Sequence, residues 1–283
     1  MTRKGNVMNN QTKTFKIVST IIVIAFMLIM IFPFVWILIT SFKPNMEIHG
    51  ASAFKIIADN PTIENYTTVI DKGILNSIKN SFIVSVITTL YVVAVSTLCS
   101  YILARCHFKG KKLLMGVILA VSMFPQMVVV GPIFNMFYKL KLLNSYWVCL
   151  AYSSITLPAA TWIMVAHFKK IPLALEEAAH MDGCSTWQTL WKVIFPVALP
   201  GVFTCAIMTF ISAWNEYLLT YTLNADKSLQ TVPVGINALR TQFAILWGEI
   251  TAATIVVVIP TLIIVLLFQK QIVSGMVSGA VKE

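Results

Sequence analysis

The sequence predicts an all-α integral membrane protein with six transmembrane helices and both termini in the cytoplasm. Of its 283 residues, 58% are apolar and only 11% are charged, less than half the share of about 25% that is typical of a soluble domain. Six uncharged runs each exceed the length of about 18 residues that suggests a spanning helix. Lysine and arginine also concentrate in alternate segments between these runs. This composition excludes a disordered chain and a large soluble domain.

The uncharged runs give the elements in order. Residues 1–16 form a cytoplasmic segment, and the first run is too long for a secretory signal, so it is retained as a helix. A transmembrane domain occupies residues 17–270, and a cytoplasmic tail follows at 271–283. At a rise of about 1.5 Å per residue, each run can cross a hydrocarbon core of about 30 Å. The expected spans are 17–42, 80–104, 113–138, 142–168, 197–222 (from the uncharged run at 193–215) and 250–269.

The net charge of +10 is explained by orientation. With the N-terminus inside, the segments assigned to the cytoplasm hold 13 of the 21 lysines and arginines, which is the positive-inside bias. No basic, aromatic-rich soluble module is present to bind nucleic acid. The five cysteines show no C-x-x-C spacing, and the four histidines form no H-E-x-x-H pair, so the sequence predicts neither a metal site nor a catalytic set.

The internal loop at residues 169–196 is the most informative segment. Its first half has the pattern of a short helix that begins after Pro172. The Asp182-Gly183 pair favours a sharp, left-handed stop. Ser185 with Gln188 three residues later matches a capping box that opens a second helix. This second helix carries Trp187, Leu190, Trp191 and Ile194 on one apolar side, and Pro196 and Pro200 are expected to close the unit.

Two interpretations of this loop are equally supported by its residues. Large tryptophans outside the bilayer form an apolar patch of the kind that marks a protein partner. Alternatively, the second helix lies flat on the membrane with its tryptophans at the headgroups.

A family resemblance favours the first interpretation. Glu177-Ala-Ala, then Gly183, then Val193-Ile-Phe-Pro196 resembles the EAA loop of ABC importer permeases, with Val193 and Phe195 in place of the usual Ile and Leu. The resemblance extends from the first helix to the last residue. The chain is similar to the shorter, six-helix subunit of the carbohydrate-uptake, maltose-type branch. Further segments that carry the resemblance are 61–66, Asn80-Ser81 opening the second helix, 104–111, Trp214-Asn-Glu216, 232–235 and 275–283.

The resemblance implies a type I ABC importer permease fold in the bacterial inner membrane and a division of labour among several proteins. The chain contains no G-x-x-x-x-G-K-[ST] motif, so it is expected to be no enzyme and to bind no cofactor itself. ATP and Mg are instead bound by two cytoplasmic ATPase subunits. The other expected partners are a second, homologous permease that completes a heterodimer, an extracytoplasmic sugar-binding protein and the sugar itself.

The resemblance also assigns candidate site residues, and no catalytic or metal-ligating residue is among them. The internal loop couples the permease to the ATPase, and the tail reaches the ATPases. Expected coupling residues are Glu177, Ala178, Ala179, Asp182, Gly183, Trp187 and Pro196; expected tail contacts are Gly275, Gly279 and Lys282.

The candidate translocation path lies on the fifth and third spans. Glu216 is costly to expose to lipid and is expected to face the bundle or a water-filled cavity. Trp214 and Asn215 suit a sugar, which stacks on rings and bonds to amides, and Gln126 after Pro125 is a weaker candidate. These residues indicate a gate or a binding site without separating the two. The competing class is a self-sufficient secondary transporter or channel, and the identity of the sugar does not follow from the sequence.

Overall fold

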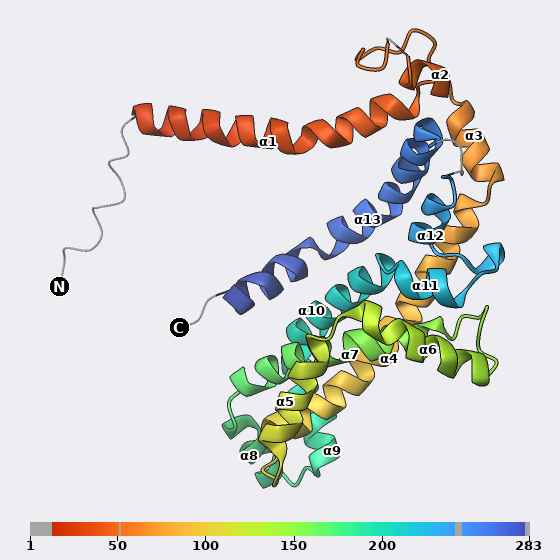
Figure 1. Ribbon diagram of the computed structural model, residues 1–283. Helices are drawn as coiled ribbons and strands as arrows, with labels where there is room; N and C mark the ends of the chain where they lie inside the picture. The colour runs from red at the N-terminus through yellow and green to blue at the C-terminus, as the bar shows by residue number, and fades with distance from the viewer. Residues whose placement is uncertain (1–12, 51, 241–244, 281–283) are drawn as a thin grey trace. The chain divides into compact units, whose positions relative to one another are not determined.

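The computed structural model describes residues 13–50, 52–240 and 245–280. The regular elements of these residues are helices (Figure 1), as the sequence predicts. The chain divides into two compact units. The first unit takes residues 1–71 and 241–256, and the second takes residues 72–240 and 257–283.

The described residues of the first unit form three helices and the start of a fourth. They are α1 (Lys13–Ser41), α2 (Asn45–Ile48), α3 (Glu64–Asp71) and the first residues of α13 (Trp247–Ala280). The most apolar window of α1 has no buried residue. A helix with so much exposed apolar surface requires a bilayer or another protein around it.

A buried lysine organises the segment that follows α1. Lys43 is 1% exposed, and its Nζ donates hydrogen bonds to the carbonyls of Ala53 (2.9 Å) and Lys55 (2.5 Å). The same ammonium lies 5.4 Å from the ring centroid of Trp36. Because a buried charge is tolerated only with such partners, Lys43 fixes the path of the loop between α2 and α3.

The second unit is a bundle built on three long helices. α4 (Ile74–Arg105) packs along α7 (Val148–Lys170) and α10 (Phe195–Trp214) (Figure 1). α8 (Ala174–Met181) and α9 (Thr186–Gln188) lie near the C-terminal end of α4, and α11 (Leu218–Leu223) and α12 (Val232–Asn237) lie near its N-terminal end. The remaining elements are α5 (Lys111–Ser122), α6 (Gln126–Lys139), the π-helical segment η1 (Thr189–Ile194), the 3₁₀ turn η2 (Lys227–Leu229) and the continuation of α13.

Small polar side chains let α4 approach its neighbours closely. Along most of its length, α4 buries serine and threonine side chains, which need little space. Ser100 donates to the carbonyl of Thr161 (2.9 Å), and Thr88 donates to that of Cys149 (3.4 Å), so both bonds tie α4 to α7. The buried hydroxyl residues of α4 are Ser77, Ser81, Ser85, Thr88, Ser96, Thr97 and Ser100.

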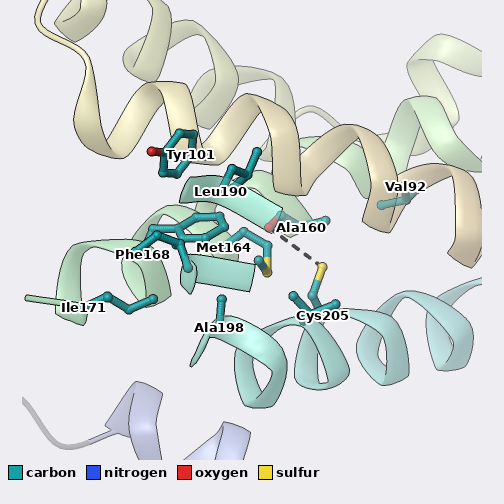
Figure 2. Packing of buried hydrophobic residues seen from close by; sticks show 11 residues of the cluster. Val92, Tyr101, Ala160, Met164, Phe168, Ile171, Leu190, Ala198 and Cys205 are labelled. Carbon is teal, nitrogen blue, oxygen red and sulfur yellow. Dashed lines mark hydrogen bonds between the residues drawn. The ribbon is translucent and has the colours of Figure 1, made fainter. Parts of the chain in front are cut away.

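An apolar cluster joins the three long helices to η1. In Figure 2, Met164 and Phe168 of α7 lie between Tyr101 of α4 and Ala198 of α10. The thiol of Cys205 points to the carbonyl of Ala160 at 4.0 Å (Figure 2). The full cluster is Val92, Tyr101, Ala160, Met164, Phe168, Ile171, Leu190, Ile194, Ala198, Val202 and Cys205.

Four of the six expected spans overlap long continuous helices. Within the described residues, the helices long and apolar enough to cross a membrane are Phe15–Ser41, Ile74–Arg105, Val148–Lys170 and Thr186–Trp214. The sixth expected span lies in α13, of which the described part includes a shorter apolar helix, Trp247–Ile263. Helix α4 begins at Ile74 after Gly73, whose φ is +92°, so Asn80 and Ser81 lie inside this helix rather than opening it.

The third expected span, 113–138, is two helices. α5 and α6 meet at an angle of 95°. The break falls at Pro125, which has no N–H to continue a helical ladder and restricts the preceding Phe124 to extended backbone. If each helix pair counts as one span, α5 and α6 make a fifth.

The internal loop and the fifth span form one continuous helix. α9, η1 and α10 follow each other without a break from Thr186 to Trp214. The prediction that Pro196 and Pro200 close the loop is therefore wrong. Pro196 directly follows the π-helical segment η1. In a membrane bundle, such local π adjustments and neighbouring groups satisfy the backbone groups that a proline leaves without partners. The helix ends at Trp214, before α11 begins, so the expected span 197–222 is not one continuous helix.

Candidate functional site

The turn after α8 has the local structure that the sequence predicts. Gly183 has a φ of +82° and donates its N–H to the carbonyl of His180 (3.0 Å), while the N–H of Cys184 reaches that of Ala179 (2.9 Å). This pair of bonds is a Schellman motif, and a left-handed residue must stand at its centre. A Cβ at Gly183 would meet nothing within 4 Å. Glycine is thus required here by the backbone rather than by crowding within the chain.

The predicted capping box at α9 is confirmed. The N–H of Gln188 donates to the hydroxyl of Ser185 (3.4 Å), and the N–H of Ser185 donates to the side-chain oxygen of Gln188 (2.9 Å). These reciprocal bonds satisfy two N–H groups that a helix start leaves without partners. A defined helix therefore begins immediately after the Gly183 turn.

The expected coupling residues lie on two different sides of the segment. Glu177, Ala178, Asp182 and Gly183 are exposed, as are Trp187 (63%) and Pro196. Ala179 is buried, at 5% exposure, so it packs into the chain itself rather than facing outward. The second helix also divides its apolar residues: Leu190 and Ile194 are buried, whereas Trp187 and Trp191 remain exposed.

A buried ion pair that the sequence did not predict lies beneath α8. Glu176 accepts a hydrogen bond from Nε of Arg105 at 2.5 Å and another from the hydroxyl of Tyr101 at 3.2 Å. Arg105 also donates to the carbonyl of Ile171 (2.8 Å). Glu177 belongs to the EAA pattern, whereas its neighbour Glu176 forms the ion pair with Arg105. Once Ala179 is known to be buried, Glu176 is expected on the same side, because helical residues three positions apart share a face.

A cavity lies among α6, α7 and α10 in the second unit. Its volume is about 260 Å³. It brings together two predicted path residues that are far apart in the sequence: Nε2 of Gln126 donates to Oε1 of Glu216 at 2.7 Å. The other lining residues are Tyr152, Ile155, Thr156, Ala159, Ala160, Ile163, Met208, Thr209, Ser212 and Ala213.

Glu216 also shapes the chain at the end of α10. Its Oε1 accepts the N–H of Leu219 (2.8 Å), and its Oε2 accepts the N–H of Thr220 (3.3 Å). A carboxylate at a helix N-terminus satisfies free N–H groups. Gln126 begins α6 directly after the 95° bend, so one hydrogen bond links the break between α5 and α6 to the break between α10 and α11.

The neighbouring path candidates lie outside this cavity. Trp214 is buried, at 6% exposure, and stacks on Phe210 with 5.8 Å between ring centroids. Asn215 is exposed, and its amide donates to the carbonyl of Ile211 (2.9 Å). Of the four predicted path residues, the cavity therefore unites Gln126 and Glu216 alone.

The remaining predictions concern the tail and metals. Gly275 and Gly279 lie in α13, and Lys282 lies outside the described residues. In the part of the chain that the structure describes, no three His, Cys, Asp or Glu side chains gather in a way that could hold a metal ion.

The family of the chain follows from sequence comparison. Residues 96–278 match the family described as the binding-protein-dependent transport system inner membrane component. This match covers α7, α10 and the whole of segment 169–196.

Several curated proteins are similar over nearly their whole length. The sulfoquinovosyl glycerol transport system permease protein SmoH of Agrobacterium fabrum is 37% identical and aligns over 89% of both chains. The trehalose/maltose transport system permease protein MalG of Thermococcus litoralis is 37% identical over 90% of this chain and 92% of its own. The trehalose transport system permease protein SugB of Mycobacterium tuberculosis is 39% identical over 88% and 92%.

A solved structure shares the fold. It is that of a bacterial ABC transporter involved in the import of the acidic polysaccharide alginate, with a TM-score of 0.70 and 22% identity, and the likeness covers 91% of this chain and 96% of that chain. The chain therefore belongs to the family of binding-protein-dependent transport system inner membrane components, as a multi-pass membrane permease of an ABC importer.

Proposed function

We propose that the chain is one of two permease subunits of an ATP-driven sugar importer, and that α8 docks on a cytoplasmic ATPase. The observation that carries this proposal is the exposed, rigidly terminated α8 at one end of the bundle, within the region that matches the family. The two ATPase subunits bind ATP and Mg, and a second, homologous permease supplies the other half of the translocation pathway. The chain itself then needs no cofactor and catalyses no reaction.

The similar proteins support a sugar as the transported substrate and a binding protein as a partner. Three relatives bear the names of transporters for sulfoquinovosyl glycerol, trehalose/maltose and trehalose. A second structure with the same fold, at a TM-score of 0.65, is that of an alginate transporter in complex with an alginate pentasaccharide-bound periplasmic protein. We infer that an extracytoplasmic protein delivers an oligosaccharide here as well. A panel of oligosaccharides titrated against the cognate binding protein identifies which one.

Substitution at Gly183 tests the docking of α8. Asp and Asn both tolerate a left-handed backbone, and a side chain at this position meets nothing within 4 Å. Gly183→Asp and Gly183→Asn therefore leave the fold of the chain intact while placing bulk on the docking surface. We expect both to reduce co-purification with the ATPase subunits and ATP-dependent sugar uptake in proteoliposomes, with Asn the milder of the pair.

Gly110 provides the matched control for backbone strain. It has a φ of +88° and equally open surroundings, but it lies before α5 and outside the docking surface. Gly110→Asp should leave assembly intact. If Gly183→Asp assembles and transports like Gly110→Asp, α8 does not dock on the ATPase. Uptake driven by an ion gradient in the absence of ATP would instead identify a secondary transporter.

The proposed orientation places both termini and segment 169–196 in the cytoplasm. Cys106 is exposed just after α4, so a variant that retains only this cysteine reports the side of the membrane. A membrane-impermeant maleimide should label it in inverted vesicles and spare it in intact spheroplasts. Lys227→Cys in a cysteine-free background should show the reverse pattern, and the same pattern for both sites would contradict the topology.

We propose that Gln126 and Glu216 line the translocation pathway. Their hydrogen bond and the cavity around it support this role, and Glu216→Gln removes the charge while keeping the size. We expect this variant to lower the uptake rate with the ATPase subunits still bound. Glu64→Gln, exposed in α3 and outside the cavity, is the control and should transport normally. Unchanged uptake and unchanged basal ATP hydrolysis in Glu216→Gln would exclude a role in the pathway.

The C-terminal tail is proposed to contact the ATPases through Gly275, Gly279 and Lys282. Removing residues 275–283 should then weaken assembly and uptake. A truncated chain that assembles and transports at the normal rate would exclude a tail contact of any consequence.

A further inference from the structure

A buried cluster of polar groups connects α8 to the bundle. We call it the Arg105 clamp, and it consists of the side chains of Arg105, Glu176 and Tyr101 and the carbonyl of Ile171. The two charged side chains are only 10% and 11% exposed, and 2.5 Å separates Nε of Arg105 from Oε1 of Glu176. Charged groups this far from water require partners at close range, and the cluster supplies them.

The members of the Arg105 clamp come from three elements of the fold, α4, α7 and α8. Arg105 is the last residue of α4, Glu176 lies in the first turn of α8, and Ile171 is the C-cap residue of α7. The guanidinium therefore binds α8 through Nε and the end of α7 through a terminal nitrogen, at 2.8 Å from the Ile171 oxygen. One side chain joins the three elements.

The geometry fixes the rotation of α8 as well as its position. Arg105 binds one oxygen of the Glu176 carboxylate, and the hydroxyl of Tyr101 binds the other at 3.2 Å. Guanidinium groups are planar and rigid, and their bonds to carboxylates are directional. Apolar contacts such as that of Ala179 allow a helix to slide, whereas this pair of bonds resists both sliding and rotation.

Tyr101 extends the connection into the bundle core. Its ring meets that of Phe168 edge to face, with 5.8 Å between the centroids, and both belong to the apolar cluster in Figure 2. The outward side of α8 carries Glu177 and Ala178, which are exposed. A push on that outward side thus reaches α4 and α7 through the Arg105 clamp.

We propose that Arg105 and Glu176 are positioning residues that transmit the displacement of α8 to α4 and α7 during transport. The inference rests on the proposed function, because it assumes that an ATPase moves α8. It differs from docking in one respect: loss of the Arg105 clamp should leave the ATPase bound and uncouple its work from sugar movement.

The test compares sugar uptake with ATP hydrolysis in proteoliposomes that contain the whole importer. Arg105→Lys keeps the positive charge but loses the rigid fork, and Glu176→Gln keeps the size but loses the charge. For both we expect normal amounts of bound ATPase and a fall of about fivefold in sugar transported per ATP, the factor that corresponds to the loss of one hydrogen bond worth about 1 kcal/mol. The double variant should be no worse than the more affected single variant, since both remove one interaction.

Two control variants separate coupling from docking and from general damage. Glu177→Gln changes the outward side of the same helix and should lower the amount of bound ATPase rather than the transport ratio. Glu64→Gln, exposed in α3, should change neither quantity. If Arg105→Lys and Glu176→Gln assemble normally and retain the wild-type ratio, the Arg105 clamp transmits nothing.

Tyr101→Phe decides the question if the charge variants fail to fold. It removes only the hydroxyl bond to Glu176 and keeps the ring against Phe168. We expect a lower ratio with normal yield, and an unchanged ratio overturns the inference. Absence of ATP-dependent uptake by the wild-type importer refutes the proposed function instead, so the two failures are distinguishable.

Discussion

Gly201 lets α10 approach α7 closely at His167. A Cβ added at this buried glycine would lie 2.5 Å from Cγ, 2.8 Å from Nδ1 and 2.9 Å from Cβ of His167, in the last turn of α7. Carbon atoms in contact normally stay about 3.5 to 4.0 Å apart, so the overlap is about 1 Å. The clashing atoms are the base of the imidazole rather than the end of a flexible chain, and Gly201→Ala must push the two helices apart.

The expected cost follows from two opposing effects. Overpacking of this kind costs about 2 to 3 kcal/mol, the upper part of its usual range, while replacing a helical glycine by alanine stabilises by about 1 kcal/mol. The net loss for Gly201→Ala is therefore about 1 to 2 kcal/mol. Gly131 in α6 is the matched control, because a Cβ there meets nothing within 4 Å. Gly131→Ala should show only the favourable effect of about 1 kcal/mol.

Thermal unfolding of the two purified variants in nanodiscs measures the difference. At about 2 to 4 °C per kcal/mol, Gly201→Ala should lower the midpoint by about 2 to 8 °C, whereas Gly131→Ala should raise it slightly. Adding His167→Ala to Gly201→Ala removes the ring and should recover part of the loss. A midpoint for Gly201→Ala at or above that of the wild type would show that α7 and α10 do not approach each other this closely.

Three further predictions concern hydrogen bonds. Asn80→Ala removes the donor to the carbonyl of Gln230 and the acceptor of the Tyr146 hydroxyl, while the carbonyl of Ser228 keeps its bond from Asn76. This variant should cost about 1 to 3 kcal/mol, measured by the same unfolding assay. Ser185→Ala removes the cap of α9 and should cost about 1 kcal/mol, seen as faster hydrogen exchange at Gln188. The pKa of Asp59 lies below its ordinary value of 3.8 because Lys55 donates hydrogen bonds to it. The resulting stabilisation of the loop between α2 and α3 is present above that value and should disappear as pH falls below it. Protease cleavage of the loop measures this change, and Asp59→Asn is the pH-insensitive control.

Local features of segment 169–196 could be read from the sequence because neighbouring residues decide them. The Schellman turn at Gly183 and the capping box at Ser185 each depend on contacts within six positions of the chain. The same locality explains the error at Pro196 and Pro200. Prolines that end a helix in water are tolerated in a membrane bundle, where neighbouring groups and π turns replace the lost bonds.

The candidate path required contacts between distant segments. The sequence indicates that Glu216 turns away from lipid, and burial cost is sufficient for that inference. Its partner was not predictable, because the bond to Gln126 depends on the bend at Pro125 that turns α6 toward α10. Trp214 and Asn215 stand beside Glu216 in the sequence, yet a helix break directs them to other surroundings.

By itself, the sequence determines that this is an all-α membrane protein, because hydropathy is a property of each local segment. It also determines that segment 169–196 contains two helices joined by a turn at Gly183, because helix capping and the backbone freedom of glycine act locally. Only the tertiary structure decides which acidic residue of α8 is buried and what it meets. Glu176 and Glu177 are adjacent and chemically identical, but about 100° of helical rotation separates them. That rotation places one against Arg105 and leaves the other exposed, and it depends on how α8 packs against α4 and α7.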